Sequence, residues 1–173
     1  QLIKCNHSST HLLHSSLREI LGNHVSQKGS LVNNEKLRFD FSHNESINID
    51  NIIKIENEVK KEIKSNSKVI TKIIDHQKAI NEGAIALFGE KYGEEVRVVS
   101  MGSIKNNQIF SKELCGGTHV KKTGDIIDFK IINQSSVASG IRRIEALTNN
   151  SVTKYKNEQL KLQIQKKEEN QIK

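Results

Sequence analysis

The stretch HSSTHLLHSSLREIL, residues 7–21, decides the fold of this chain. Its large apolar side chains recur at the spacing of one helical face, at Leu12, Leu13, Leu17, Ile20 and Leu21. Gly22 follows them as a natural helix stop. The pattern predicts an amphipathic helix over residues 7–21 with one buried face.

The segments that follow this helix alternate between strand and helix patterns. Residues 25–32 and 36–41 are predicted strands, and Asn33-Asn34 between them tolerate the positive φ of a tight hairpin turn. A second helix is predicted from a cap at Asp50 to about Lys64. The remaining predicted elements are a strand at 68–74, a short helix at 75–83, and strands at 96–101, 128–133 and 141–147. The polar residues 104–109 are expected to form a hairpin tip or an inserted loop.

This mixture predicts an α+β domain over residues 1–150, with a mainly antiparallel sheet and helices packed on it. From Ser151 onward the chain is rich in Lys, Glu, Gln and Asn and has few apolar residues. Such a segment forms a helix but cannot build a core by itself. We therefore expect residues 151–173 to be a linker helix or the start of a coiled coil.

The composition favours a basic protein of a reducing compartment. The 173 residues carry a formal net charge of +7, which attracts polyanions such as nucleic acid. A lysine-rich protein without any nucleic-acid partner would carry the same charge. No secretory signal or long apolar run is present, so we expect a cytoplasmic location and no membrane partner. In that setting Cys5 and Cys115 are candidates for metal ligation or for plain burial.

Two short motifs together predict one metal site. His7 and His11 are four residues apart, on one face of the first helix, and Cys115 and His119 flank a Gly-Gly-Thr turn. Each pair alone is a weak signal. Two pairs with mixed nitrogen and sulfur donors suit one Zn²⁺ ion per chain. His14 and Cys5 are further potential ligands, for which packing or capping is the preferred interpretation.

The residues around the two histidines also disfavour one class of zinc enzyme. A metalloprotease helix carries a glutamate base between its histidines, whereas this chain has Ser8, Ser9 and Thr10 there. Four protein ligands are typical of structural zinc, and catalytic zinc keeps an open position. The sequence leaves both roles open.

The chain resembles a known family, the editing domain of alanyl-tRNA synthetase. The resemblance covers roughly residues 7–148 and, more distantly, extends to the threonyl-tRNA synthetase editing domain. It rests on the two ligand motifs and on four longer runs, residues 24–30, 37–41, 83–93 and 140–146.

The resemblance implies hydrolysis of the ester that joins Ser or Gly to alanine tRNA. The family's zinc ligands match His7, His11, Cys115 and His119, and a glutamine implicated in editing matches Gln27. Without the resemblance, Gln27 is simply a polar strand residue. The implied partners are alanine tRNA and the remaining domains of a parent synthetase, with a possible oligomer through the C-terminal helix.

Further residues near these motifs are candidates for substrate contacts. The backbone N–H groups of Gly116 and Gly117 can support a developing oxyanion, or the glycines serve turn geometry alone. Thr118 is a candidate for recognising the hydroxyl group of a serine substrate by a hydrogen bond, or it only stabilises its loop. The basic residues expected at tRNA phosphates are Lys28, Arg38, Arg142 and Arg143.

The sequence departs from the family pattern in two places. No Gly-rich β-barrel segment precedes Gln1, and residues 104–109 look longer than the family's usual loop. A chain without an aminoacylation domain is not expected to charge tRNA, so ATP binding belongs to the parent protein alone. Two alternatives therefore stand beside the synthetase domain: a free-standing deacylase that acts in trans, and a zinc-stabilised RNA-binding module without activity.

Overall fold

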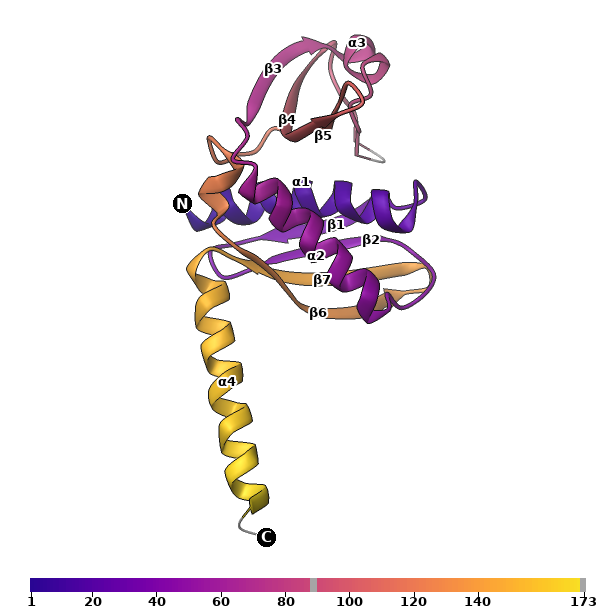
Figure 1. Cartoon of the computed structure of the whole chain (residues 1–173). Coiled ribbons are helices and arrows are strands. Elements are labelled where there is room, and N and C mark those ends of the chain that lie inside the picture. The colour runs from indigo at the N-terminus through magenta and orange to yellow at the C-terminus, as the bar shows by residue number, and fades with distance from the viewer. Residues whose placement is uncertain (88–89, 172–173) are drawn as a thin grey trace.

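The computed structural model describes residues 1–87 and 90–171. Two residues of the family-like stretch 83–93, numbers 88 and 89, lie outside the described residues, as do residues 172–173 of the predicted C-terminal helix. The described chain forms two antiparallel sheets and four α-helices, which confirms the α+β class (Figure 1). In chain order the elements are α1 (Leu2–Leu21), β1 (Gln27–Val32), β2 (Leu37–Ser42), α2 (Ile49–Lys64), β3 (Ile70–Asp75), α3 (His76–Asn81), β4 (Glu95–Lys105), β5 (Gln108–Leu114), the 3₁₀ turn η1 (Thr123–Ile126), β6 (Phe129–Ala138), β7 (Ile141–Thr148) and α4 (Asn150–Gln171).

The larger sheet has the strand order β1-β2-β7-β6 and the smaller one β3-β4-β5. The hairpin between β1 and β2 forms as predicted. The prediction of positive φ angles in its turn is wrong, since Asn33 and Asn34 both have negative φ. Instead, the Asn33 side chain accepts hydrogen bonds from the backbone N–H groups of Glu35 and Lys36, at 2.8 and 2.9 Å. An Asx-type side-chain contact therefore closes this turn.

The positive φ angles occur in the other hairpin, between β4 and β5. Asn106 and Asn107 have φ of 52° and 62°, as a two-residue turn of the primed type requires. Both strands continue through residues 104, 105, 108 and 109, so this region is a hairpin tip and not an inserted loop.

Several predicted boundaries need correction. Helix α1 begins five residues before His7. Helix α2 is capped by Asn48 and not by Asp50, since the Asn48 side chain accepts the N–H of Asn51 at 2.8 Å. Strand β6 runs to Ala138, beyond the predicted end at residue 133.

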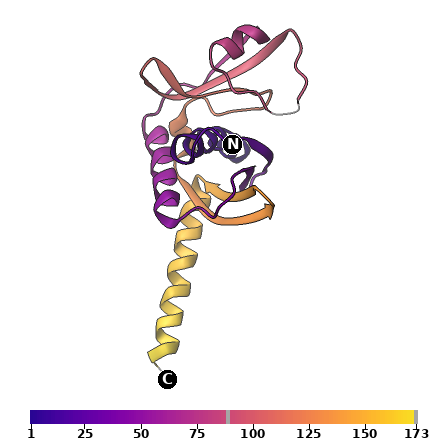
Figure 2. The same cartoon turned by 90° about the vertical axis from the view of Figure 1, so that its right-hand side faces the viewer.

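Helix α1 lies between the two sheets (Figure 1), and Figure 2 shows it nearly end-on, with α2 beside it. Its leucines pack with Phe39, Phe41 and Ile144 of the larger sheet in the main core. Its polar side is also buried, because strand β5 and the segment after it cover that side. The buried polar side chains of α1 are Asn6, Ser8, Ser9, Thr10, His11, His14 and Ser16.

Helix α4 leaves the end of β7 and extends away from the rest of the molecule (Figure 1). Val152 is buried at its base, and Lys156 forms an ion pair of 2.9 Å with Asp128. Beyond these residues its side chains are mostly exposed, including Leu160 and Ile164. The linker or coiled-coil role and the domain division at residue 150 stay predictions. Among the described residues, no helix is long and apolar enough to cross a membrane.

The packing of α1 generates a test of the core. Leu13→Ala removes a fully buried side chain between the helix and the larger sheet, so we expect a loss of about 2–5 kcal/mol in the free energy of unfolding. Leu160→Ala, at a leucine of α4 that is 57% exposed, is the matched control and should change stability by no more than about 0.5 kcal/mol. Urea unfolding followed by circular dichroism measures both; equal losses would contradict this core.

Candidate metal centre

The first turns of α1 and the turn after β5 bring the four predicted ligands together. One donor atom from each of His7, His11, Cys115 and His119 lies within 4.8 Å of the others. The two histidines of α1 share one face because they are four residues apart in a helix. The other two donors arrive from more than 100 positions further along the chain, so only the tertiary fold unites the two pairs.

The imidazole rings are held through their Nδ1 atoms. The Nδ1–H of His7 donates to the backbone carbonyl of Thr118 at 3.2 Å. Nδ1 of His11 lies 2.7 Å from a carboxylate oxygen of Glu113, and Nδ1 of His119 lies 3.3 Å from the hydroxyl of Ser8. Outer partners of this kind orient the ligands of a metal.

The Nε2 atoms consequently point toward the centre of the cluster. Nε2 of His7 lies 3.4 Å from Sγ of Cys115. Nε2 of His11 and Nε2 of His119 are buried and have no hydrogen-bond partner among the described residues. A buried, unpaired nitrogen is costly unless something satisfies it. The donor set of three imidazoles and one thiol therefore fits a metal ion, and its softness suits zinc.

Cys115 is prepared as a thiolate. Burial opposes its charged form, but the neighbouring imidazoles of His11, His119 and His7 outweigh burial and lower the pKa of Cys115 to about 3. The N–H of Gly117 also donates to Sγ, at 3.4 Å. Burial lowers the pKa of His119, which favours the neutral imidazole that a metal needs.

Arg97 of β4 holds the turn that carries Cys115. One nitrogen of its guanidinium group donates to the carbonyls of Cys115 and Gly117, at 2.6 and 2.8 Å. The backbone carbonyl of Arg97 in turn accepts the N–H of Cys115 at 3.0 Å. The turn is thus tied to the neighbouring strand on both sides of the ligand.

Glu113 is a residue of the site that sequence reasoning missed. It is 3% exposed, and its second oxygen lies 2.8 Å from Nδ1 of His14. His14 is therefore engaged by the carboxylate and is not one of the four grouped ligands. Cys5 is buried and donates to the carbonyl of Asp125 at 3.4 Å. The structure buries residues 111 and 113 on one side of β5, but nothing local in the sequence indicated that Glu113 would be buried or what it would meet.

The charges of His11 and Glu113 strongly affect one another. Burial disfavours the cation of His11, but the adjacent Glu113 carboxylate outweighs burial and raises the pKa of His11 to about 10. Burial likewise opposes the Glu113 anion, yet His11 and His14 lower the pKa of Glu113 to about 2. The carboxylate is thus ionised at neutral pH.

The two glycines of the turn differ in what surrounds them. A Cβ atom at Gly117 would overlap the His7 ring, whereas a Cβ at Gly116 would meet nothing within 4 Å. Neither has a positive φ, so close approach of His7 is the reason for glycine at 117. Thr118 has an exposed side chain next to this turn.

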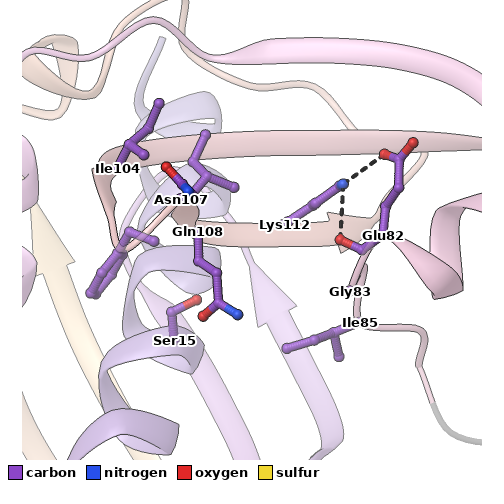
Figure 3. A pocket seen from close by; sticks show the side chains of 10 residues that line it. Ser15, Glu82, Gly83, Ile85, Ile104, Asn107, Gln108 and Lys112 are labelled. Atoms are coloured by element: carbon purple, nitrogen blue, oxygen red, sulfur yellow. Dashed lines mark hydrogen bonds and ion pairs between the residues drawn. The ribbon is translucent and has the colours of Figure 1, made fainter.

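Two cavities are candidates for a binding pocket, and only one of them contacts the site. One, of about 440 Å³, is lined by Cys115 and Gly116 and also by Arg97 and Tyr92. The other, of about 380 Å³, lies between Ser15 of α1 and the β4–β5 hairpin (Figure 3). An ion pair of 2.9 Å between Lys112 and Glu82 closes one side of it. None of the four metal-site residues lines this second cavity, so the first is the cavity of interest.

The remaining predicted contact residues lie on the larger sheet, and none of them belongs to the group of four potential ligands. Gln27 begins β1 and is half-buried, and Lys28 sits at the bulge that follows it. Arg143 of β7 pairs with Asp40 of β2 at 2.7 and 2.9 Å. Asp40 also lies 3.7 Å from Arg38, and Arg142 donates to Gln134 at 3.2 Å. The proposed roles of these residues in catalysis or tRNA binding stay predictions.

Comparison with known proteins places the chain in a family. Residues 96–145 match the model described as the threonyl and alanyl tRNA synthetase second additional domain. That match defines the class of the protein as a domain of aminoacyl-tRNA synthetases.

The curated relatives narrow the class. The chain is 54% identical over 154 residues to the alanine–tRNA ligase of Nitrosomonas eutropha, which covers 89% of this chain and 17% of the relative. It is 52% identical over 161 residues to that of Mesorhizobium japonicum and 52% over 158 residues to that of Legionella pneumophila, with 91% of this chain and 18% of each relative covered. The chain belongs to the alanyl-tRNA synthetase family, as a domain of the editing region. It spans less than a fifth of the length of these relatives.

The glycine pair provides a matched test of the metal centre. Gly117→Ala should displace the His7 ring and weaken zinc binding about tenfold or more, because one ligand loses its position. Gly116→Ala, in open space one residue away, should leave zinc affinity unchanged. Competition with a chromophoric chelator measures both affinities. Equal affinities for the two variants would refute the cluster as a zinc site.

Proposed function

We propose that this domain hydrolyses Ser- or Gly-charged alanine tRNA, as a zinc-dependent proofreading deacylase within an alanyl-tRNA synthetase. The observation that carries the proposal is the convergence of His7, His11, Cys115 and His119 in a chain more than half identical to alanine–tRNA ligases. The parent protein would supply aminoacylation and ATP binding, in the cytoplasm, and α4 would link this domain to an oligomerising segment.

The residues present suit ester hydrolysis. An aminoacyl ester is already activated, so positioning and electrostatic stabilisation suffice without a strong protein nucleophile. When bound, zinc would orient the amine or hydroxyl of the substrate or polarise a water molecule. The protein's part is to hold three imidazoles and one thiolate in place before the substrate arrives.

The cavity beside Cys115 is the proposed place for the aminoacyl group. Gly116 lines it, and its backbone N–H is the candidate donor to a developing oxyanion. Gly117 is a weaker candidate because its N–H already donates to the Cys115 sulfur. Gln27 is proposed to complete the editing pocket. Lys28, Arg38, Arg142 and Arg143 are proposed to contact tRNA phosphates, in keeping with the net charge of +7.

Deacylation assays test the proposed function directly. We expect the chain to hydrolyse Ser-charged alanine tRNA, to spare Ala-charged tRNA, and to lose activity when a zinc chelator is added. His11→Ala should lower both the zinc content and the deacylation rate. Tight tRNA binding by the zinc-loaded chain without any hydrolysis would favour the RNA-binding module instead.

Substrate discrimination is tested at Thr118. Thr118→Val removes only the hydroxyl and keeps the backbone carbonyl that accepts the His7 hydrogen bond, so the metal centre should stay intact. If the hydroxyl reads serine, the variant should clear Ser-charged tRNA more slowly or hydrolyse Ala-charged tRNA faster. Initial rates on the two substrates give the comparison, and unchanged rates on both would remove Thr118 from the pocket.

A further inference from the structure

The Glu113 side chain links two histidines of α1 to strand β5. One carboxylate oxygen lies 2.7 Å from Nδ1 of His11 and the other lies 2.8 Å from Nδ1 of His14. We propose that Glu113 is the positioning residue of the metal centre and that it aims Nε2 of His11 at the metal. This inference rests on the metal site proposed above but not on the hydrolytic reaction.

The carboxylate can impose one tautomer on His11. A neutral imidazole carries a single N–H, and an ionised carboxylate only accepts hydrogen bonds. The hydrogen of a metal-binding His11 must therefore be on Nδ1, which leaves the Nε2 lone pair free. Nε2 is buried and lacks a hydrogen-bond partner among the described residues, and His11 is one of the four grouped residues.

His14 makes the same carboxylate rigid. It lies three residues after His11, so both rings project from the same side of α1 toward β5. Because each oxygen of Glu113 has its own N–H donor, the carboxylate cannot rotate without breaking a buried hydrogen bond. His14 thus acts through Glu113 and not as a ligand.

The position of Glu113 in the strand couples it to a second ligand. It is two residues before Cys115, and the backbone on either side of Cys115 is held by Arg97. The segment from Glu113 to Cys115 therefore positions the Cys115 sulfur and, through the Glu113 carboxylate, orients the His11 ring. A buried carboxylate is costly to desolvate, so its use here is better explained by orientation than by net stability.

Glu113→Gln tests the role with little change in shape. An amide offers one acceptor oxygen, so at most one of the two rings keeps its Nδ1–H bond, and that bond loses its charge. We expect zinc affinity to fall about 10–100-fold, measured with Zn²⁺ alone by chelator competition. Glu113→Asp keeps the charge but is too short to bridge both rings, and it should give an intermediate loss.

Glu62→Gln is the matched control. Glu62 is 1% exposed and accepts hydrogen bonds from the backbone N–H and the hydroxyl of Ser103. Within the described ranges no hydrogen bond or ion pair joins it to a metal-site histidine. We expect both glutamine variants to lower the thermal unfolding midpoint, but only the change at Glu113 to lower zinc affinity. Equal affinity losses in the two variants would reduce Glu113 to a structural residue and overturn the inference.

An NMR spectrum of the zinc-loaded wild-type protein tests the proposed orientation of His11 even if Glu113→Gln does not fold. Long-range ¹H–¹⁵N NMR should show His11 bound to zinc through Nε2, with a hydrogen retained on Nδ1. Ligation through Nδ1 would rule out the proposed orientation. A wild-type chain that binds no zinc would refute the metal centre itself, whereas zinc binding that is insensitive to Glu113→Gln would refute only the role of Glu113.

Discussion

The fold depends on one constraint, which is that helix α1 is buried on two sides. The larger sheet covers its leucines, and its buried polar side chains are covered by the smaller sheet, by the segment after β5, by α2 and, at Asn6, by one end of the larger sheet. Each buried polar group there needs a partner, since an unpaired one costs about 1–3 kcal/mol. Asn6, for example, donates to the Asn33 carbonyl at 2.8 Å and accepts from Thr148 at 2.6 Å. These bonds tie the helix to two different parts of the larger sheet.

The metal cluster is one part of that polar interface in which buried nitrogens have no hydrogen-bond partner among the described residues; Ser9, Ser111 and Nε2 of His14 are others. Hydrogen bonds hold the outer nitrogens of His7, His11 and His119, while the inner nitrogens converge on Cys115. These outer contacts orient the donor atoms toward one another. A metal ion held by these four residues would join α1 to the turn after β5.

Much of the fold was accessible from sequence because it depends on local periodicity. The apolar spacing from Leu12 to Leu21 predicted α1, and strand patterns predicted six of the seven strands to within a few residues, apart from the longer ends of β4 and β6. Strand β5 (Gln108–Leu114) and the division into two sheets were not predicted. The errors arose where side chains decide local geometry. Asn33 closes its turn by side-chain hydrogen bonds, and Asn48 rather than Asp50 caps α2, because several neighbouring residues were equally capable of either role.

The sequence by itself predicted the four residues that lie together and could hold a metal ion. Residue type and spacing within each short motif define the chemistry, and both pairs are local. Only the tertiary structure decided that the pairs meet, that Glu113 lies between His11 and His14, and that glycine at 117 leaves room for the His7 ring. Those facts depend on how a strand about 100 residues away packs against α1. A periodic pattern shows which face of an element is buried, but not which residue of another element it meets.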